Sequence, residues 1–382
     1  MSDRHVPRVP VVLAWLGLVV AAAAMPFLLD SFWLQTGLFC MAAIIGAIGL
    51  TLLVGVAGQL SLGHAFFVAV GAYGYSYLAG QPPPGSIEGP SGLGLPPAVA
   101  VCGAVLAAGL AGALFSPISG RLRGIYLGLA SLGLVFLGQH VLLNATSLTG
   151  GFDGRDAEPF SLFGFSFSDT DPEGLQVLGV PFGILERLWY VGLVLVAAAW
   201  LFARNVLRSR SGRALATVRD SEVAAGSLGV NVTRYKGAAF VVSSMYAGLA
   251  GVLMALTFGR IVPDSFGLVL SVDFLVMIVI GGLGSVGGAA VGAVFVTALP
   301  LLLNRYSDVL PFLAEAGSGG ISAVELSRFL YGLAIVAVLL FAREGVVGLL
   351  HTLRPKPPGG DRPGRRPTAT STTPPDAQET VT

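Results

Sequence analysis

Charged side chains are scarce in this sequence. Only 11% of its 382 residues are Asp, Glu, Lys or Arg, against roughly a quarter in an ordinary soluble domain. Hydrophobic residues make up 54%, so a soluble fold of this length would lack polar side chains to cover its surface. The composition therefore excludes a soluble enzyme and a nucleic-acid-binding protein.

Cysteine and lysine are also rare. Cys40 and Cys102 both lie in apolar runs, so we interpret them as small core residues, which excludes a secreted disulfide scaffold. A phosphate-binding loop needs Gly-Lys-Ser/Thr, and neither Lys236 nor Lys356 is followed by Ser or Thr. If ATP drives this protein, a separate chain must hydrolyse it.

Long apolar runs are abundant instead. A helix that crosses a bilayer needs about 20 residues, and the hydropathy pattern predicts a series of crossings. The runs are approximately 11–29, 34–57, 62–80, 97–118, 125–146, 188–204, 237–258, 270–283, 287–303 and 326–342. We therefore predict an all-α, polytopic integral membrane protein with about ten transmembrane helices.

The distribution of basic residues predicts the orientation. Cytoplasmic segments of membrane proteins carry an excess of Lys and Arg. If 270–303 forms two passes, most of the 22 basic residues lie inside, and the outer ones are Arg155, Arg187, Arg260, Arg305 and Arg328. We predict two passes there, full or partly re-entrant, with both termini cytoplasmic and the chain in the plasma membrane.

The division of the chain follows from this topology. Residues 1–10 form a cytoplasmic N-terminus, 11–345 the transmembrane domain, and 346–382 a disordered cytoplasmic tail rich in Pro, Thr and Gly. Residues 147–187 form an acidic outer loop, which is either a solvated loop or a docking surface. Residues 205–236 form a cytoplasmic loop.

The cytoplasmic loop contains a short helix signal. Asp220 or Ser221 can cap a helix whose first turn carries Glu222, and Gly229 can end it. Small residues at 224–226 give this helix a slim surface. It is either a lever that sits in a groove of a soluble partner or a basic loop held near lipid headgroups.

Glycine patterns mark two further segments. Gly284, Gly288 and Gly292 are spaced by four, which favours close helix packing. The segment 55–64 places Gln59, Ser61 and His64 among glycines between two apolar runs. Polar side chains on unwound backbone at membrane depth often form a transport pathway, although a short cytoplasmic turn is the simpler alternative.

Asp273 lies in a strongly apolar run. Carboxylates inside a membrane are costly and therefore indicate function. This one is close to the predicted outer edge, so a capping role at a helix start is the alternative. His140, near the outer end of the fifth run, has the same two readings.

Several blocks together resemble the M-type permease subunit of branched-chain amino-acid ABC importers (LivM-like). The first is Gly55-Val-Ala-Gly-Gln-Leu-Ser-Leu-Gly-His-Ala-Phe-Phe, and the others follow in the family's order over roughly residues 37–345. They are Gly71-Ala72-Tyr73, Arg123-Gly124-Ile125-Tyr126, Leu148-Thr149-Gly150-Gly151, Gly212-Arg213-Ala214, Arg219-Asp220, Ala224-Ala225, Leu228-Gly229-Val230-Asn231, Lys236, Ala247-Gly248-Leu249-Ala250-Gly251, Pro263 and Gly281-Gly282-Leu283-Gly284-Ser285.

The resemblance implies partners and residue roles. Such subunits pair with a homologous second permease, two cytoplasmic ABC ATPases and an extracytoplasmic substrate-binding protein, and need no cofactor, metal or nucleic acid. The family's Glu-Ala-Ala…Gly coupling motif fits loosely here, because Val223 intervenes. The residues implied in coupling are Arg213, Arg219, Asp220, Glu222, Ala224, Ala225 and Gly229. The residues expected along the pathway are Gln59, Ser61, His64, Ser131 and Asp273.

The expected function is ATP-driven import of branched-chain or similar hydrophobic amino acids by alternating access. The ligand would pass along the second, third, fifth and eighth helices. Relatives of the same architecture carry urea, short amides or aromatic amino acids. Two rivals are an ion-driven carrier, for which only Asp273 and the histidines are candidate groups, and a lipid-modifying enzyme that would use Asp153, Asp156 and Glu158 with a metal.

Overall fold

The structure is a computed structural model that describes residues 17, 20–81, 92–122, 124–162, 165–168, 176–177, 180–307 and 322–341. The predicted N-terminus, tail and much of the first apolar run lie outside the described residues. The helices are α2 (Ser31–Leu50), α3 (His64–Ala79), α4 (Pro97–Arg121), α5 (Ile125–Asn144), α6 (Thr146–Thr149), α7 (Ile184–Arg208), α8 (Arg210–Asp220), α9 (Glu222–Ser227), α10 (Val232–Phe258), α11 (Leu268–Gly281), α12 (Val286–Arg305) and α13 (Ala323–Phe341).

Shorter elements join these helices. The π-helical segment η2 (Thr51–Val56) continues α2, and 3-10 turns lie at η1 (Met25–Phe27), η3 (Gly151–Asp153) and η4 (Pro263–Phe266). The two-residue strands are β1 (Arg155–Asp156), β2 (Ser161–Leu162), β3 (Phe165–Ser166), β4 (Gln176–Val177), β5 (Val180–Pro181) and β6 (Arg260–Ile261). They pair antiparallel as β1–β6, β2–β3 and β4–β5.

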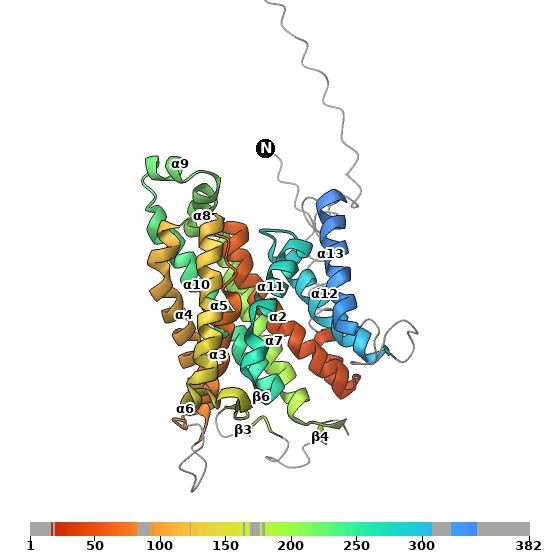
Figure 1. The fold of residues 1–382 in the computed structure, drawn as a ribbon. Helices are drawn as coiled ribbons and strands as arrows, with labels where there is room; N and C mark the ends of the chain where they lie inside the picture. The colour runs from red at the N-terminus through yellow and green to blue at the C-terminus, as the bar shows by residue number, and fades with distance from the viewer. Residues whose placement is uncertain are drawn as a thin grey trace, which may run out of the picture.

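The long helices form a membrane bundle, with α8 and α9 at one end and α6, β3 and β4 at the other (Figure 1). Six helices in the described ranges are long and apolar enough to cross a membrane: α2 with η2, α4, α5, α7, α10 and α12. This confirms the predicted helical, multi-pass architecture, whereas the total of about ten spans stays a prediction. The run 270–303 forms two helices, α11 and α12, separated by a turn.

Helix α10 lies at the centre of the bundle. It packs against α2, α3 and α4, and its buried residues are mostly small, including Ala247, Gly248, Ala250 and Gly251. A Cβ at Gly251 would lie 2.0 Å from the carbonyl oxygen of Val68 in α3. The small residues therefore let the helix backbones approach directly, as membrane helices do.

The outer loop is folded against the bundle. Strand β1 pairs with β6, which follows α10, and the buried Arg155 donates to the carbonyls of Ser76 (2.9 Å) and Leu148 (2.8 Å). The buried Arg187 donates to the carbonyl of Phe182 at 3.0 Å. Two basic side chains in an otherwise acidic loop thus fix it to the ends of the neighbouring helices.

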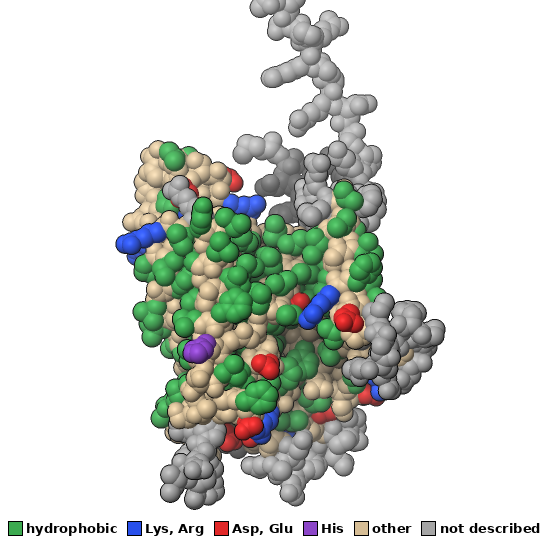
Figure 2. Space-filling model, viewed as in Figure 1, with side chains coloured by type: hydrophobic (Ala, Val, Ile, Leu, Met, Phe, Trp, Pro, Cys, Tyr) green, Lys and Arg blue, Asp and Glu red, His purple; other side chains and the backbone are tan. Residues whose placement is uncertain are grey.

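The surface agrees with a membrane environment. Figure 2 shows hydrophobic side chains over the middle of one face, with most charged side chains nearer its two ends. Large apolar side chains are exposed along α4 and α5, including Leu110, Leu114 and Phe136. An apolar band of this kind would be unfavourable in water and is favourable against lipid.

Candidate functional site

The short helix α9 projects from the end of the bundle (Figure 1). Of the two predicted caps, Ser221 is the N-cap, and its hydroxyl accepts from the amide of Ala224 at 3.2 Å. Asp220 is the last residue of α8. Gly229 has a φ of +80°, a left-handed conformation that suits glycine just after a helix. The local sequence therefore forms a capped, separate helix.

The surface of α9 is apolar at its tip. Val223 is 79% exposed and Leu228 is 75% exposed, and Ala224 is exposed while Ala225 is buried. In the sequence, Val223 interrupts the Glu-Ala-Ala…Gly motif of the family. The structure places it on the exposed surface of the helix.

An ion pair joins α9 to the central helix. Glu222 contacts the ammonium group of Lys236 in the first turns of α10, and Lys236 is only 5% exposed. The backbone carbonyl of Lys236 accepts from Nε2 of Gln59 at 3.0 Å. Glu222, Lys236 and Gln59 therefore form one chain of contacts from α9 through α10 to the α2–α3 connection.

Arg219, at the end of α8, makes a second link to the bundle. Its guanidinium donates to the carbonyl of Gly55 in η2. Gly55 packs against the α11–α12 turn, because a Cβ there would lie 2.3 Å from the amide nitrogen of Gly284. By contrast, Arg213 is exposed and donates to the carbonyl of Arg208 at 3.3 Å. Arg219, and not Arg213, therefore reaches the membrane helices.

The α2–α3 connection is a tight buried turn. The hydroxyl of Ser131 in α5 accepts from the amide of Leu62 at 2.9 Å and donates to the carbonyl of Gly128. The hydroxyl of Ser61 accepts from the amide of Gly63 at 3.3 Å. Gln59, Ser61 and Ser131 are all buried. The structure thus brings these three predicted pathway residues together, where they hold unwound backbone in place.

His64 begins α3 and is also buried. Its Nε2 lies 3.0 Å from the carbonyl oxygen of Gly46 in α2, and its ring packs edge-on against Phe274 of α11, with centroids 4.8 Å apart. The neighbouring amide of Ala65 donates to the hydroxyl of Ser271 at 3.0 Å. His64 therefore lies where α2, α3 and α11 meet.

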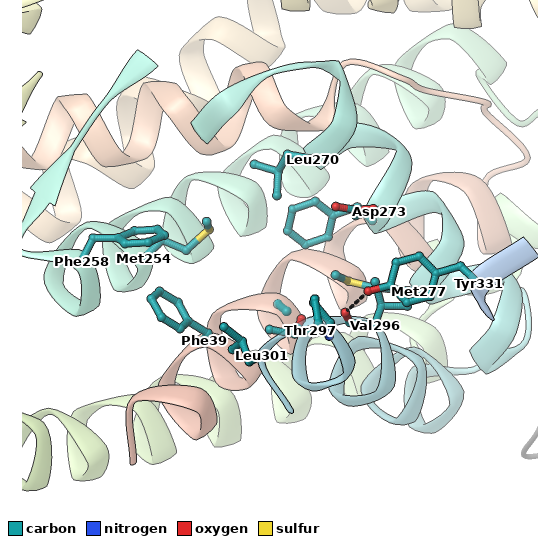
Figure 3. A pocket seen from close by; sticks show the side chains of 13 residues that line it. Phe39, Met254, Phe258, Leu270, Asp273, Met277, Val296, Thr297, Leu301 and Tyr331 are labelled. Carbon is teal, nitrogen blue, oxygen red and sulfur yellow. Dashed lines mark hydrogen bonds between the residues drawn. The ribbon is translucent and has the colours of Figure 1, made fainter. Parts of the chain in front are cut away.

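Asp273 lies apart from this cluster. Helix α11 begins at Leu268 with Gly267 as its N-cap, so Asp273 does not cap the helix start. It lines a cavity of about 270 Å³ between α2, α10, α11, α12 and α13 (Figure 3).

His140 is exposed, and Nδ2 of Asn144 donates to its backbone carbonyl.

The predicted glycine series has two roles. Gly288 and Gly292 face α11, since a Cβ at either would lie 2.1 Å or less from a backbone oxygen of Gly281 or Met277. Gly284 lies before α12, in the turn, with a φ of +86°. Sequence spacing within α12 gave no sign of Gly281, which is the partner of Gly288 on the opposite helix.

Arg260 contacts two acidic residues of the outer loop, one through its carboxylate and one through its backbone carbonyl. A carboxylate oxygen of Asp156 accepts from Arg260 at 3.3 Å, and Arg260 also donates to the carbonyl of Asp153. Across the described ranges, no three His, Cys, Asp or Glu side chains gather as a metal site would require. Among these acidic side chains, that of Asp156 attaches the loop to β6.

Comparison with known proteins gives a consistent result. A family model described as a branched-chain amino acid transport system permease component matches residues 32–339. The high-affinity branched-chain amino acid transport system permease protein LivM of Salmonella typhimurium is 34% identical over 302 residues, covering 77% of this chain and 68% of that protein.

Two other relatives share less of the sequence. The permease protein LivH of the same type of system in Escherichia coli is 26% identical over 308 residues, covering 79% of this chain and 90% of that protein. The autoinducer 2 import system permease protein LsrC of Klebsiella pneumoniae is 33% identical over 140 residues, covering 35% of this chain and 39% of that protein. No solved structure matches this chain.

Proposed function

Since the chain belongs to the family of branched-chain amino acid transport system permease components, we propose that it is the subunit through which an ATP-driven importer moves branched-chain amino acids across the plasma membrane. The observation that carries this proposal is the family match over residues 32–339. The multi-pass bundle and the identity with LivM support it.

The mechanism is alternating access driven from α9. Closure of the partner ATPases on binding ATP displaces α9, and two links pass the displacement to the bundle. The Glu222–Lys236 pair acts on α10, and Arg219 acts on the π-helical end of α2 and on the adjacent α11–α12 turn. The turn that carries Gln59, Ser61 and His64 connects α2 to α3 and is hydrogen-bonded to Ser131 of α5. It then moves together with these three helices.

The partners are two cytoplasmic ABC ATPases, a homologous second permease and an extracytoplasmic substrate-binding protein, with both chain termini in the cytoplasm. The exposed apolar side chains of Val223 on α9 and of Leu228 just after it support contact with an ATPase, because exposed apolar side chains on a slim helix are suited to a groove. The second permease is supported by the two relatives LivM and LivH, which are distinct permease proteins named for the same type of system.

The test is uptake by the complete complex in membrane vesicles. With ATP on the side of the vesicle membrane that carries the ATPases and the binding protein on the opposite side, labelled leucine should accumulate against its gradient. Unlabelled isoleucine and valine should compete with it, whereas urea and phenylalanine should not. Accumulation of leucine by this subunit without the ATPases, or competition by urea alone, would contradict the proposal.

A further inference from the structure

The cavity between α2, α10, α11, α12 and α13 has two chemically different ends. In Figure 3, the apolar side chains of Phe39, Met254, Phe258 and Leu301 lie toward one side, and Asp273 and Tyr331 lie toward the other. Its volume of about 270 Å³ approaches the lower end of small-molecule pockets, roughly 300 Å³. The lining is mostly apolar, and Asp273 and Tyr331 give it one polar edge, so it suits a molecule with a large apolar part and a polar end.

A basic group lies near the polar end, on α13 and outside the lining of the cavity. Arg328 precedes Tyr331 by three residues on α13, so the two share one face of that helix. Helix α13 packs against α11, the helix that carries Asp273. Within the described part of the chain Arg328 and Asp273 form no direct ion pair, because no guanidinium nitrogen of the one lies within 4 Å of a carboxylate oxygen of the other. Opposite charges thus lie on two neighbouring helices without a direct ion pair.

The position of these charges calls for an explanation. Asp273 lies in the second turn of an apolar helix, and ionised groups among membrane helices are costly unless they pair or serve a pathway. Asp273 is half-buried, while Arg328 is exposed. A ligand that carries both a positive and a negative group could bridge the two side chains and satisfy both.

We propose that this cavity binds the transported amino acid during translocation. The ammonium group binds Asp273, the carboxylate binds Arg328, and the branched apolar side chain lies against Phe39, Met254 and Phe258. This assignment rests on the proposed function and adds to it the residues that recognise each part of the substrate.

A second cavity in the bundle provides a matched control. It has a volume of about 300 Å³ between α4, α7 and α10, and its lining includes Ala198, Phe202 and Met245 with no charged residue. An amino acid would gain apolar contacts there but no partner for its charges. Leucine should therefore protect a probe in the first cavity and not in the second.

The test is protection of an introduced cysteine in the complete reconstituted transporter. Cys40 and Cys102 are replaced by Ala, and Thr297→Cys, in the lining of the first cavity, is labelled with a small maleimide. Leucine should slow the labelling. With Asp273→Asn or Arg328→Gln, half-protection should need roughly tenfold more leucine or higher, as expected for a lost charge-assisted bond. If Thr297→Cys fails to assemble, Leu301→Cys replaces it.

Leucine analogues separate the two charges. 3-Methylbutylamine, which lacks the carboxylate, should lose protection with Asp273→Asn and keep it with Arg328→Gln. 4-Methylpentanoate, which lacks the ammonium group, should show the reverse. Arg305→Gln, at the outer end of α12, is the control for a removed arginine and should leave protection unchanged.

Two results overturn the proposal. One is equal protection of Thr297→Cys and of Ala198→Cys in the second cavity, and the other is protection that neither neutral variant weakens. Uptake of leucine by the unsubstituted complex is measured in parallel. Uptake without protection contradicts this cavity alone, whereas an absence of uptake contradicts the proposed function whatever the cavity binds.

Discussion

Single side chains in this molecule join helices that are far apart in the sequence. Lys236 is the clearest example, because its ammonium group pairs with Glu222 while its carbonyl accepts from Gln59. The sequence indicated Glu222 and Gln59 as separate candidates for coupling and for the pathway. It gave no sign that they meet through Lys236, since the three residues lie on different elements and their contact depends on tertiary packing.

Loss of the Glu222 charge should destabilise the end of α10 that carries Lys236. In Glu222→Gln the buried ammonium of Lys236 loses its ion partner, which costs up to about 3 kcal/mol for a pair of this kind. Adding Lys236→Met should recover part of the loss. Thermal unfolding in detergent measures both. Asp220→Asn, at an exposed neighbouring position, is the control and should change stability by less than about 0.5 kcal/mol.

Arg219→Gln should reduce coupling more than it reduces stability. The substitution removes a charged donor from the carbonyl of Gly55, an interaction worth roughly 1.5–3 kcal/mol. We expect normal membrane insertion and ATPase association, with several-fold less leucine taken up per ATP hydrolysed. Arg213→Gln, whose arginine bonds within its own segment, is the matched control. Equal losses in the two variants would argue against a link through Gly55.

At the scale of elements, the α11–α12 pair is defined by backbone contact. The break at 282–285 was predictable because charge asymmetry requires two passes there, and glycines mark the turn. The interacting face was only partly predictable. A four-residue spacing identifies small residues on α12, but it cannot identify Gly281 on the partner helix or place Gly284 outside the helix. The π-helical form of η2 was likewise not visible in the sequence.

Gly292→Leu should prevent close packing of α11 and α12. A Cβ at this position would lie 1.9 Å from the carbonyl oxygen of Met277, and overpacking of a backbone contact costs about 3 kcal/mol or more. The expected result is low yield and a lower melting temperature. Gly287→Ala lies on the same helix, and its new Cβ would meet Trp200 at an ordinary 3.6 Å. A normal melting temperature for Gly292→Leu would contradict this packing.

For the whole molecule, hydropathy predicted most of the architecture. Each expected run from 34–57 to 326–342 falls in a helix of its own, because burial in lipid imposes a length and an apolar composition on every span. The outer loop was not predictable in the same way. Its strand β1 pairs with β6, which lies about a hundred residues later in the chain, and such short strands have no periodic pattern.

The predicted orientation can be tested by labelling from each side of the membrane. In a chain without Cys40 and Cys102, Ser227→Cys on α9 should react with an impermeant maleimide only in inside-out vesicles. Phe152→Cys, at an exposed position in the outer loop, should react only in right-side-out vesicles. Reaction of both from the same side would overturn the topology derived from the basic residues.

Helix α10 runs without interruption for 27 residues, about 40 Å at 1.5 Å per residue. One end carries Lys236 beside α9, and the other leads directly into β6, which is hydrogen-bonded to the outer loop. A continuous helix held at both ends can couple binding at one end to binding at the other, and such coupling is thermodynamically reciprocal. In the proposed importer, a binding protein that docks on the outer loop therefore changes the nucleotide affinity of the ATPases by the same factor by which nucleotide changes its own affinity.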